Sequence, residues 1–176
     1  MGTKQALLEL QSRLAEKLQS AKTSGVSASW LAVEAGKSRL LFPLTHAGEI
    51  FSWTRVQPVP YARKWFLGMV NLRGGLCGVV DLEAFISGVA SAPRSEMALA
   101  QARLVALNPL LEVNCALLVD RLVGLRTAEA FVASAPAPAS APAYFGHVYR
   151  DPEGGEWQEI NLQVLSHSPA FLGIVV

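Results

Sequence analysis

Charged residues are scarce in this chain of 176 residues. They make up 16% of it, whereas an ordinary domain has roughly 25%, and hydrophobic residues make up 51%. A surface so poor in charge indicates that partners cover part of it. The net charge is only +1, so no strong electrostatic attraction to nucleic acid or to an anionic membrane is expected.

Cysteine is also rare, and no apolar run is long enough to span a bilayer. Cys77 and Cys115 lie in apolar, strand-like segments, which predicts buried thiols in a reducing compartment instead of a disulfide framework. The longest apolar stretch, residues 104–119, is interrupted by polar residues and a proline. The first residues do not form a signal peptide. We therefore expect a cytoplasmic protein with no direct membrane insertion.

Motifs for catalysis, metal binding and cofactor binding are missing. The histidines His46, His147 and His167 do not lie at ligand spacing from another histidine, cysteine or carboxylate, which argues against zinc. No phosphate-binding glycine loop and no nucleophile elbow is present. The sequence predicts a protein that is not an enzyme and has no cofactor or metal. A small hydrolase assembled around His46 or His147 is an alternative.

Residues 4–20 predict an amphipathic helix. Leu7, Leu10, Leu14 and Leu18 recur at spacings of three and four, which places them on one stripe. A lone amphipathic helix must bury such a stripe against something. Packing on its own domain is the favoured interpretation, and docking onto a partner helix is the alternative. Mixed charges and the lack of aromatic residues argue against a membrane-surface helix.

From Trp30 onward the hydrophobic period is two, which is typical of strands. The expected strands are residues 30–34, 39–44, 48–53, 66–73, 76–80, 103–107, 113–119, 120–125, 144–149 and 156–160. Gly74-Gly75 is the expected turn of a hairpin over residues 65–82. Short helices are expected at 81–86, capped by Asp81, and at 162–165. Residues 91–95 read as a linker, and the Pro/Ala-rich residues 133–143 as an exposed polyproline-like loop.

The two halves of the chain resemble each other. Residues 66–82 and residues 144–162 each contain an apolar strand, a Gly-Gly turn and a polar residue before leucine. Each half supplies about five short strands, and five twisted strands can close or nearly close. We predict a mostly β protein with two small five-stranded β-barrels side by side, an added N-terminal amphipathic helix and short helical turns.

Polar residues end the first strand of the hairpin over residues 65–82. Strict alternation would place Asn71 and Arg73 on one face with Leu67 and Met69, and Phe66, Gly68, Val70 and Leu72 on the other. A charged residue at the end of an apolar face marks either a contact site or a solvated strand end. Arg63-Lys64 beside Trp65-Phe66 is the only basic–aromatic cluster, so a small barrel that binds single-stranded nucleic acid is an alternative.

This hairpin resembles the signature of the chemotaxis coupling (CheW-like) family. The matching segments are Gly48-Glu49-Ile50, Pro58-Val59-Pro60, residues 66–74 (FLGMVNLRG), residues 79–82 (VVDL) and residues 116–122 (ALLVDRL). The N-terminal helix and the segments around Trp53 and Trp65 are more similar to the type IV pilus (PilI-like) branch than to the flagellar one. Gly78 and the Ala116-Leu117 pair depart from the family's pattern.

The resemblance implies a chemosensory adaptor that is not an enzyme. Its partners would be the tip of a methyl-accepting chemoreceptor and the regulatory domain of a histidine kinase, whose fold is similar, with no nucleic acid. The adaptor would be cytoplasmic, recruited to inner-membrane receptor arrays, and would control twitching motility, with flagellar chemotaxis as the alternative pathway. Carried over by position, the implied partner-binding residues are Arg73, Glu49, Ile50, Gly68, Asn71, Leu72 and Gly74.

The domain organisation expected from this resemblance has three parts. Residues 1–25 form the N-terminal helix and its linker. Residues 26–168 form the CheW-like domain, with a boundary between its two barrels near residues 90–100. Residues 169–176 form a C-terminal tail.

Overall fold

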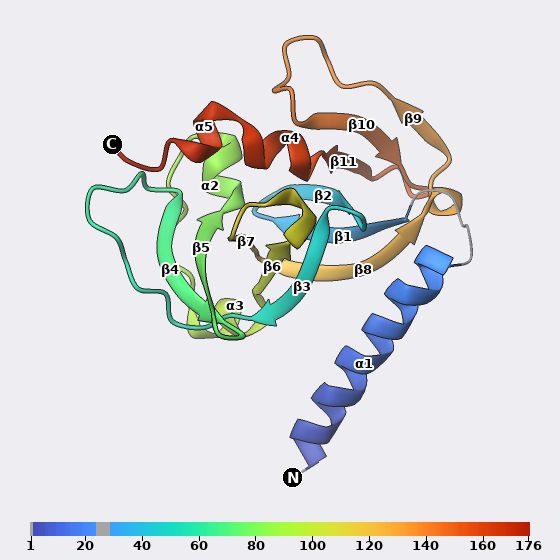
Figure 1. Ribbon diagram of the computed structural model, residues 1–176. Coiled ribbons are helices and arrows are strands. Elements are labelled where there is room, and N and C mark those ends of the chain that lie inside the picture. The colour runs from blue at the N-terminus through green and yellow to red at the C-terminus, as the bar shows by residue number, and fades with distance from the viewer. Residues whose placement is uncertain (1, 24–28) are drawn as a thin grey trace.

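The computed structural model describes residues 2–23 and 29–176, with the side chains of residues 3–15 in the N-terminal segment. In this part of the chain the strands form two sheets (Figure 1). The six-stranded sheet has the order β8 (Arg121–Thr127), β1 (Ser29–Ala35), β2 (Ser38–Pro43), β11 (Glu156–Ile160), β10 (Phe145–Arg150), β9 (Ala133–Ala135). The five-stranded sheet has the order β3 (Ala47–Ser52), β6 (Arg103–Leu107), β7 (Cys115–Val119), β5 (Gly75–Asp81), β4 (Phe66–Leu72).

Short helices connect and cover the strands. The α-helices are α1 (Gly2–Thr23), α2 (Leu82–Ser87), α3 (Glu96–Gln101), α4 (Leu162–His167) and α5 (Pro169–Leu172), and the 3-10 turns are η1 (Pro109–Leu111) and η2 (Ala128–Ala130). The mostly β class with two sheets is confirmed. Among the described residues the outer strands of each sheet are not paired with each other, so neither sheet closes into a barrel through backbone hydrogen bonds.

The internal repeat is present, but its halves exchange strands. In chain order, β1 to β5 followed by α2 correspond to β6, β7, β8, β10 and β11 followed by α4. The first hairpin of each half joins the sheet of the other half, through the parallel pairs β5–β7 and β2–β11. No cut near residues 90–100 therefore separates the two sheets, and the expectation that each half builds its own barrel is wrong.

Three apolar clusters result from this arrangement. The largest lies between the two sheets and takes side chains from both, such as Phe42 and Leu117, which are fully buried. The outer face of the five-stranded sheet covers a second cluster around Val79 and Leu104. The outer face of the other sheet covers a third, around Trp30 and Trp157. Each sheet thus buries both faces, which explains the continuous apolar runs of its central strands.

Several connections are more ordered than the sequence indicates. The expected linker at 91–95 leads directly into α3, whose N-cap is Ser95. The first residues of the Pro/Ala-rich stretch form β9 at the sheet edge, and the rest is largely exposed. The expected tail at 169–176 contains α5 with buried Phe171, and Val175 forms a bridge to Ala62.

The N-terminal helix is present but does not bury its leucines. Leu7, Leu8 and Leu10 are 53%, 64% and 65% exposed, and Leu14 is half-buried. The favoured expectation that the helix packs on its own domain is therefore wrong for Leu7 and Leu10. Leu18, the last residue of the predicted stripe, lies outside the described side chains. No helix in the described segments is long and apolar enough to cross a membrane.

Candidate protein-interaction site

Arg73 lies at the tip of the β4–β5 hairpin. Leu72 pairs with Gly75, so the two turn residues are Arg73 and Gly74, and both have positive φ, 49° and 75°. This is the backbone of a two-residue type I′ turn. The expected Gly74-Gly75 turn is therefore shifted by one residue. Arg73 does not end a strand but projects from the turn, with 73% of its side chain exposed.

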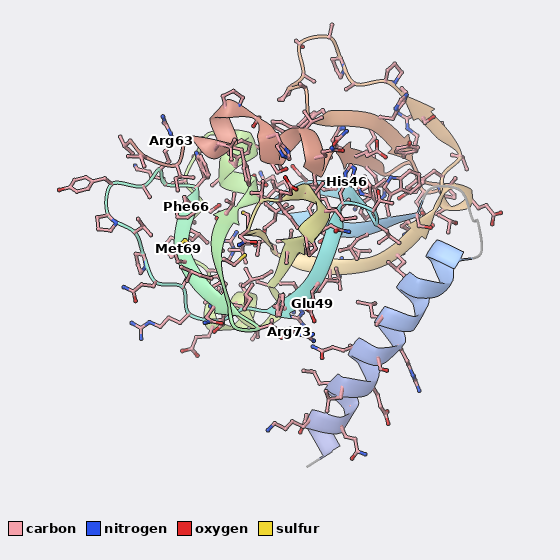
Figure 2. The ribbon with its side chains drawn as sticks, viewed as in Figure 1. His46, Glu49, Arg63, Phe66, Met69 and Arg73 are labelled. Carbon is pink, nitrogen blue, oxygen red and sulfur yellow. The ribbon has the colours of Figure 1, made fainter. Side chains whose placement is uncertain are left out.

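Glu49 comes from the other side of the same sheet and meets Arg73. It lies on edge strand β3, and its Oε1 is 2.5 Å from Nη2 of Arg73 (Figure 2). The ion pair thus links the two outer strands of the five-stranded sheet, β3 and the β4 hairpin. Because both side chains are substantially exposed, 73% and 42%, the pair contributes little to stability. Both charges remain accessible to a partner.

Apolar side chains surround this ion pair. A hollow of about 250 Å³ beside it is lined by Leu72, Leu76 and backbone and side chains of β5, β6 and β7. Leu76 is 61% exposed, and its strand neighbour Asn71 is also exposed. Ile50 is half-buried. An exposed ion pair beside accessible leucines resembles the rim and centre of a protein interface.

Gly68 lies away from this surface and has a structural explanation. It is buried at a β-bulge of β4, with φ of 139°, where Phe66 pairs with Val80 and Gly68 with Val79. A Cβ at this position would overlap the carbonyl oxygen of Gln57 and lie 2.6 Å from its carbonyl carbon. The glycine lets the 53–65 loop approach β4. Gly68 therefore has a role in shaping the hairpin, and its predicted role in partner binding stays a prediction.

The bulge also corrects the predicted faces of β4. Phe66 packs in the cluster between the sheets, whereas Val70 and Leu72 pack in the outer cluster of the five-stranded sheet. Strict alternation would have put all three on one face. The extra residue, Leu67, reverses the alternation after Phe66. Six of the seven implied partner-binding residues lie near or on the hairpin tip and β3, and Gly68 is the exception.

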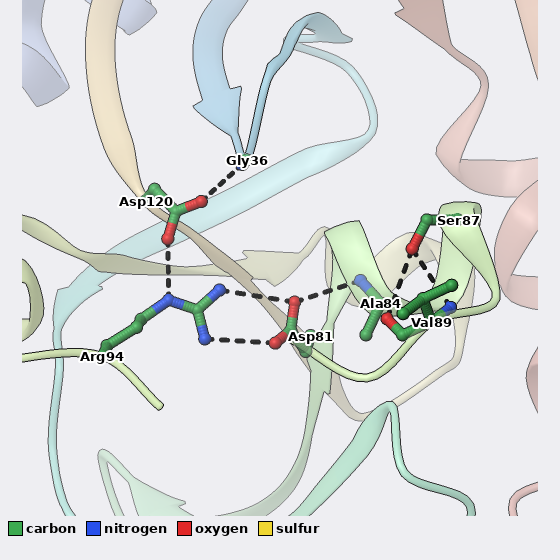
Figure 3. Close-up of polar contacts among 7 residues, drawn as sticks. All are labelled: Gly36, Asp81, Ala84, Ser87, Val89, Arg94 and Asp120. Atoms are coloured by element: carbon green, nitrogen blue, oxygen red, sulfur yellow. Dashed lines mark hydrogen bonds and ion pairs between the residues drawn. The ribbon is translucent and has the colours of Figure 1, made fainter. Parts of the chain in front are cut away.

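Asp81, Arg94 and Asp120 form a polar cluster beneath α2 that the sequence analysis does not predict (Figure 3). Asp81 is only 2% exposed, caps α2 and accepts a hydrogen bond from Nη1 of Arg94 at 3.1 Å. Arg94 also donates from Nε to Asp120 at 2.7 Å, and Asp120 accepts from the backbone N–H of Gly36 in the β1–β2 turn. Arg94 therefore ties together segments from both sheets. An aspartate at the end of each of two buried strands, Asp81 as the last residue of β5 and Asp120 directly after β7, is the sequence signal for this cluster.

Burial and charge shift several pKa values around this cluster and the hairpin. Burial opposes the charge of Arg94, yet hydrogen bonds to Asp81 and Asp120 raise its pKa above the usual value. Burial, and then the nearby carboxylates, raise the pKa of Glu83. Burial raises the pKa of the Cys77 thiol. Both cysteines are free and buried, as predicted. In the described segments, no group of three or more potential metal ligands comes together.

The fold defines a known class of two-sheet β proteins. The crystal structure of the scaffolding protein TtCheW from Thermoanaerobacter tengcongensis is similar, with a TM-score of 0.64 and 15% identity over 81% of this chain and 94% of that chain. The family model of the CheW-like domain matches residues 29–168. The chain therefore belongs to the CheW-like domain family, and the predicted family is confirmed.

A curated relative is similar to this chain in sequence over part of its length. The chemotaxis protein CheW of Rhizobium meliloti (strain 1021) is 32% identical over 63 residues, which are 36% of this chain and 41% of that protein. The match thus spans less than half of the relative's length.

Proposed function

We propose that this chain is a chemosensory adaptor, without enzymatic activity, that couples a methyl-accepting chemoreceptor to the regulatory domain of a histidine kinase. Membership of the CheW-like family supports the adaptor class. The observation that carries the proposal is the exposed Glu49–Arg73 ion pair beside accessible Leu76, at the hairpin whose sequence carries the family signature. Apolar contacts would supply affinity, and the two charges would set register and partner choice.

We further propose that the pathway is the one that controls type IV pilus twitching motility. The resemblance of the N-terminal helix and of the segments around Trp53 and Trp65 to the pilus branch supports this assignment over flagellar chemotaxis. The adaptor would act in the cytoplasm at inner-membrane receptor arrays. Deletion of the gene should then abolish twitching zones on agar while swimming is retained. Loss of swimming with normal twitching would favour the flagellar pathway.

Arg73→Glu should weaken partner binding without unfolding the protein. The substitution places a second carboxylate next to Glu49, and an exposed turn position tolerates either side chain. We expect binding of the receptor tip or the kinase regulatory domain to weaken at least about tenfold. Isothermal titration calorimetry measures the affinity, and circular dichroism should give an unchanged melting temperature. A large fall in the melting temperature would instead show that Arg73 is needed for folding.

Arg150→Glu is the matched control. Arg150 forms an equally exposed ion pair with Glu156 on the corresponding hairpin of the other half, with side chains 57% and 63% exposed. Its reversal should leave partner binding within about twofold of wild type. The double variant Glu49→Arg/Arg73→Glu restores an ion pair with reversed polarity. Recovery of binding would show that the ion pair itself is required for binding. Continued loss would mean that the partner contacts each charge individually.

A further inference from the structure

A hollow of about 760 Å³ lies where the 53–65 loop, α2 and α5 meet. Two cationic residues, Arg63 and Lys64, and three aromatic residues, Trp65, Phe85 and Tyr144, line it. The hollow shares no lining residue with the one at the hairpin tip, and the labelled Arg63 lies away from that tip in Figure 2. It is therefore separate from the candidate interaction site, and it contains most of the basic–aromatic cluster of the sequence.

Aromatic rings supply the apolar part of this hollow. Trp65 packs edge-on against Phe85, with ring centroids 5.0 Å apart, and stacks on Phe171 at 6.1 Å and 19°. The three rings come from the 53–65 loop, α2 and α5, so packing between distant elements holds them in place. Trp65 and Phe85 are only half-buried, which leaves part of each ring accessible to a ligand.

The charged side chains that line the hollow are both cationic. Lys64 is exposed and forms no ion pair within the described part of the chain. Arg63 donates from Nε to the carbonyl oxygen of Gly173 at 2.7 Å, which holds the guanidinium at the hollow. Its two Nη groups have no partner among the described residues. Two cations without an acidic side chain among the described lining residues favour an anionic occupant.

Tyr144 adds a hydroxyl that has no partner in the described segments. The residue is only 9% exposed and lines the hollow. Burial raises the pKa of Tyr144, so its hydroxyl keeps the proton and can donate it in a hydrogen bond. The hydroxyl of a buried tyrosine usually has such a partner. An acceptor atom of a bound ligand would supply the missing one.

The edge of the hollow favours a peptide over a free small molecule. Gly88, Pro142 and Pro169 at this edge are exposed, and the hollow is open to solvent. A small-molecule site encloses roughly 70–90% of its ligand, which an open hollow does not do. A peptide needs to place only one anchoring side chain inside, while its backbone lies across the edge.

We propose that this hollow binds an acidic segment of a partner protein, in which carboxylates flank an aromatic or large apolar side chain. The apolar side chain packs on Trp65 and Phe85. The flanking carboxylates pair with Lys64 and with the Nη groups of Arg63, and one of them accepts a hydrogen bond from the hydroxyl of Tyr144.

The probe for this site is a short synthetic peptide with aspartates on both sides of a phenylalanine, titrated into the full chain. Trp65 is one of four tryptophans, and comparison with Trp65→Phe assigns its indole N–H signal in the NMR spectrum. The acidic peptide should shift this signal. The same peptide with asparagines in place of the aspartates should bind at least about tenfold more weakly.

Three variants test the lining residues. Lys64→Glu should weaken binding of the acidic peptide at least about tenfold with an unchanged melting temperature, because Lys64 is exposed. Tyr144→Phe should weaken it about fivefold and also keep its melting temperature, because the hydroxyl has no partner to lose. Lys37→Glu makes the same charge change at an exposed turn outside the hollow. This control should bind within about twofold of wild type.

Four outcomes would overturn the proposal. If the acidic peptide at millimolar concentration does not shift the Trp65 signal, the hollow is not a peptide site. Equal binding of the asparagine peptide would mean that charge does not select the occupant. Equal losses in Lys64→Glu and Lys37→Glu would mean that the attraction is non-specific. If phenylacetate alone binds as tightly as the peptide, the site takes a small anion instead of a protein segment.

Discussion

Arg94→Ala should lower the free energy of unfolding by about 3–5 kcal/mol, which is typical for breaking a buried ion pair. The variant leaves the carboxylate of Asp81, only 2% exposed, without its main cationic partner. It also frees Asp120, which holds the β1–β2 turn through the N–H of Gly36. Urea unfolding measures the change, and the melting temperature should fall by roughly 6–20 °C.

Arg121→Ala is the control for this prediction. Arg121 also forms a two-point contact with a carboxylate, Glu34, but its side chain is 55% exposed. Its loss should leave the melting temperature nearly unchanged, because water screens such a pair. If Arg94→Ala is as stable as Arg121→Ala, the Arg94 cluster does not hold the sheets together.

A double-mutant cycle with Asp81→Asn isolates the buried charge. Asparagine can still accept the hydrogen bond from the N–H of Ala84, so the cap of α2 is retained. The pair Asp81→Asn/Arg94→Ala should therefore be less destabilised than the sum of the single variants, by about 1–3 kcal/mol. Additive losses would mean that Arg94 acts through packing and not through charge.

Local patterns predicted most of the strands and caps. The β1–β2 and β4–β5 hairpins follow from alternating apolar residues and turn residues, and Asp81 caps α2 as predicted. These features depend on residues close together in the chain, which is why the sequence reveals them. The five-strand repeat was also visible, since Asp81 and Asn161 occupy corresponding N-cap positions before α2 and α4.

Long-range arrangements could not be predicted in the same way. The exchange of hairpins between sheets depends on the parallel pairs β5–β7 and β2–β11, which no local pattern encodes. The bulge at Leu67 depends on the approach of Gln57, a residue on a separate loop. Arg94 was assigned to a linker because its two carboxylate partners are distant in sequence.

The candidate site was predictable only through family resemblance. Composition gave no reason to join Glu49 with Arg73, and the strand pattern placed Arg73 at a strand end. The structure brings the two residues together although β3 and β4 lie at opposite edges of one sheet, separated by three strands. Their importance for partner binding stays a prediction that the Arg73→Glu experiment tests.

Gly68→Ala should destabilise the protein by about 2–5 kcal/mol, through steric overlap and backbone strain together. The added Cβ would overlap the backbone of Gln57, which cannot rotate away as a side chain could. The residue also has φ of 139°, which L-residues rarely adopt. Relief requires the 53–65 loop to leave β4 and to break both hydrogen bonds between Gln57 and Met69, each 2.8 Å long. Thermal unfolding followed by circular dichroism measures the loss.

Gly124→Ala separates steric overlap from backbone strain. Gly124 has nearly the same φ, 141°, but an added Cβ would meet only Nη1 of the flexible Arg126 side chain, at 3.5 Å, so only the backbone penalty of about 1–3 kcal/mol applies. The difference between the two variants is the contribution of the Gln57 contact. Binding of the chemoreceptor tip by Gly68→Ala, measured well below the melting temperature of the variant, decides between a structural and a partner-binding role of this glycine. Loss of binding with an unchanged melting temperature would mean that Gly68 contacts the partner directly, and would contradict the structural role inferred from its burial in the hairpin.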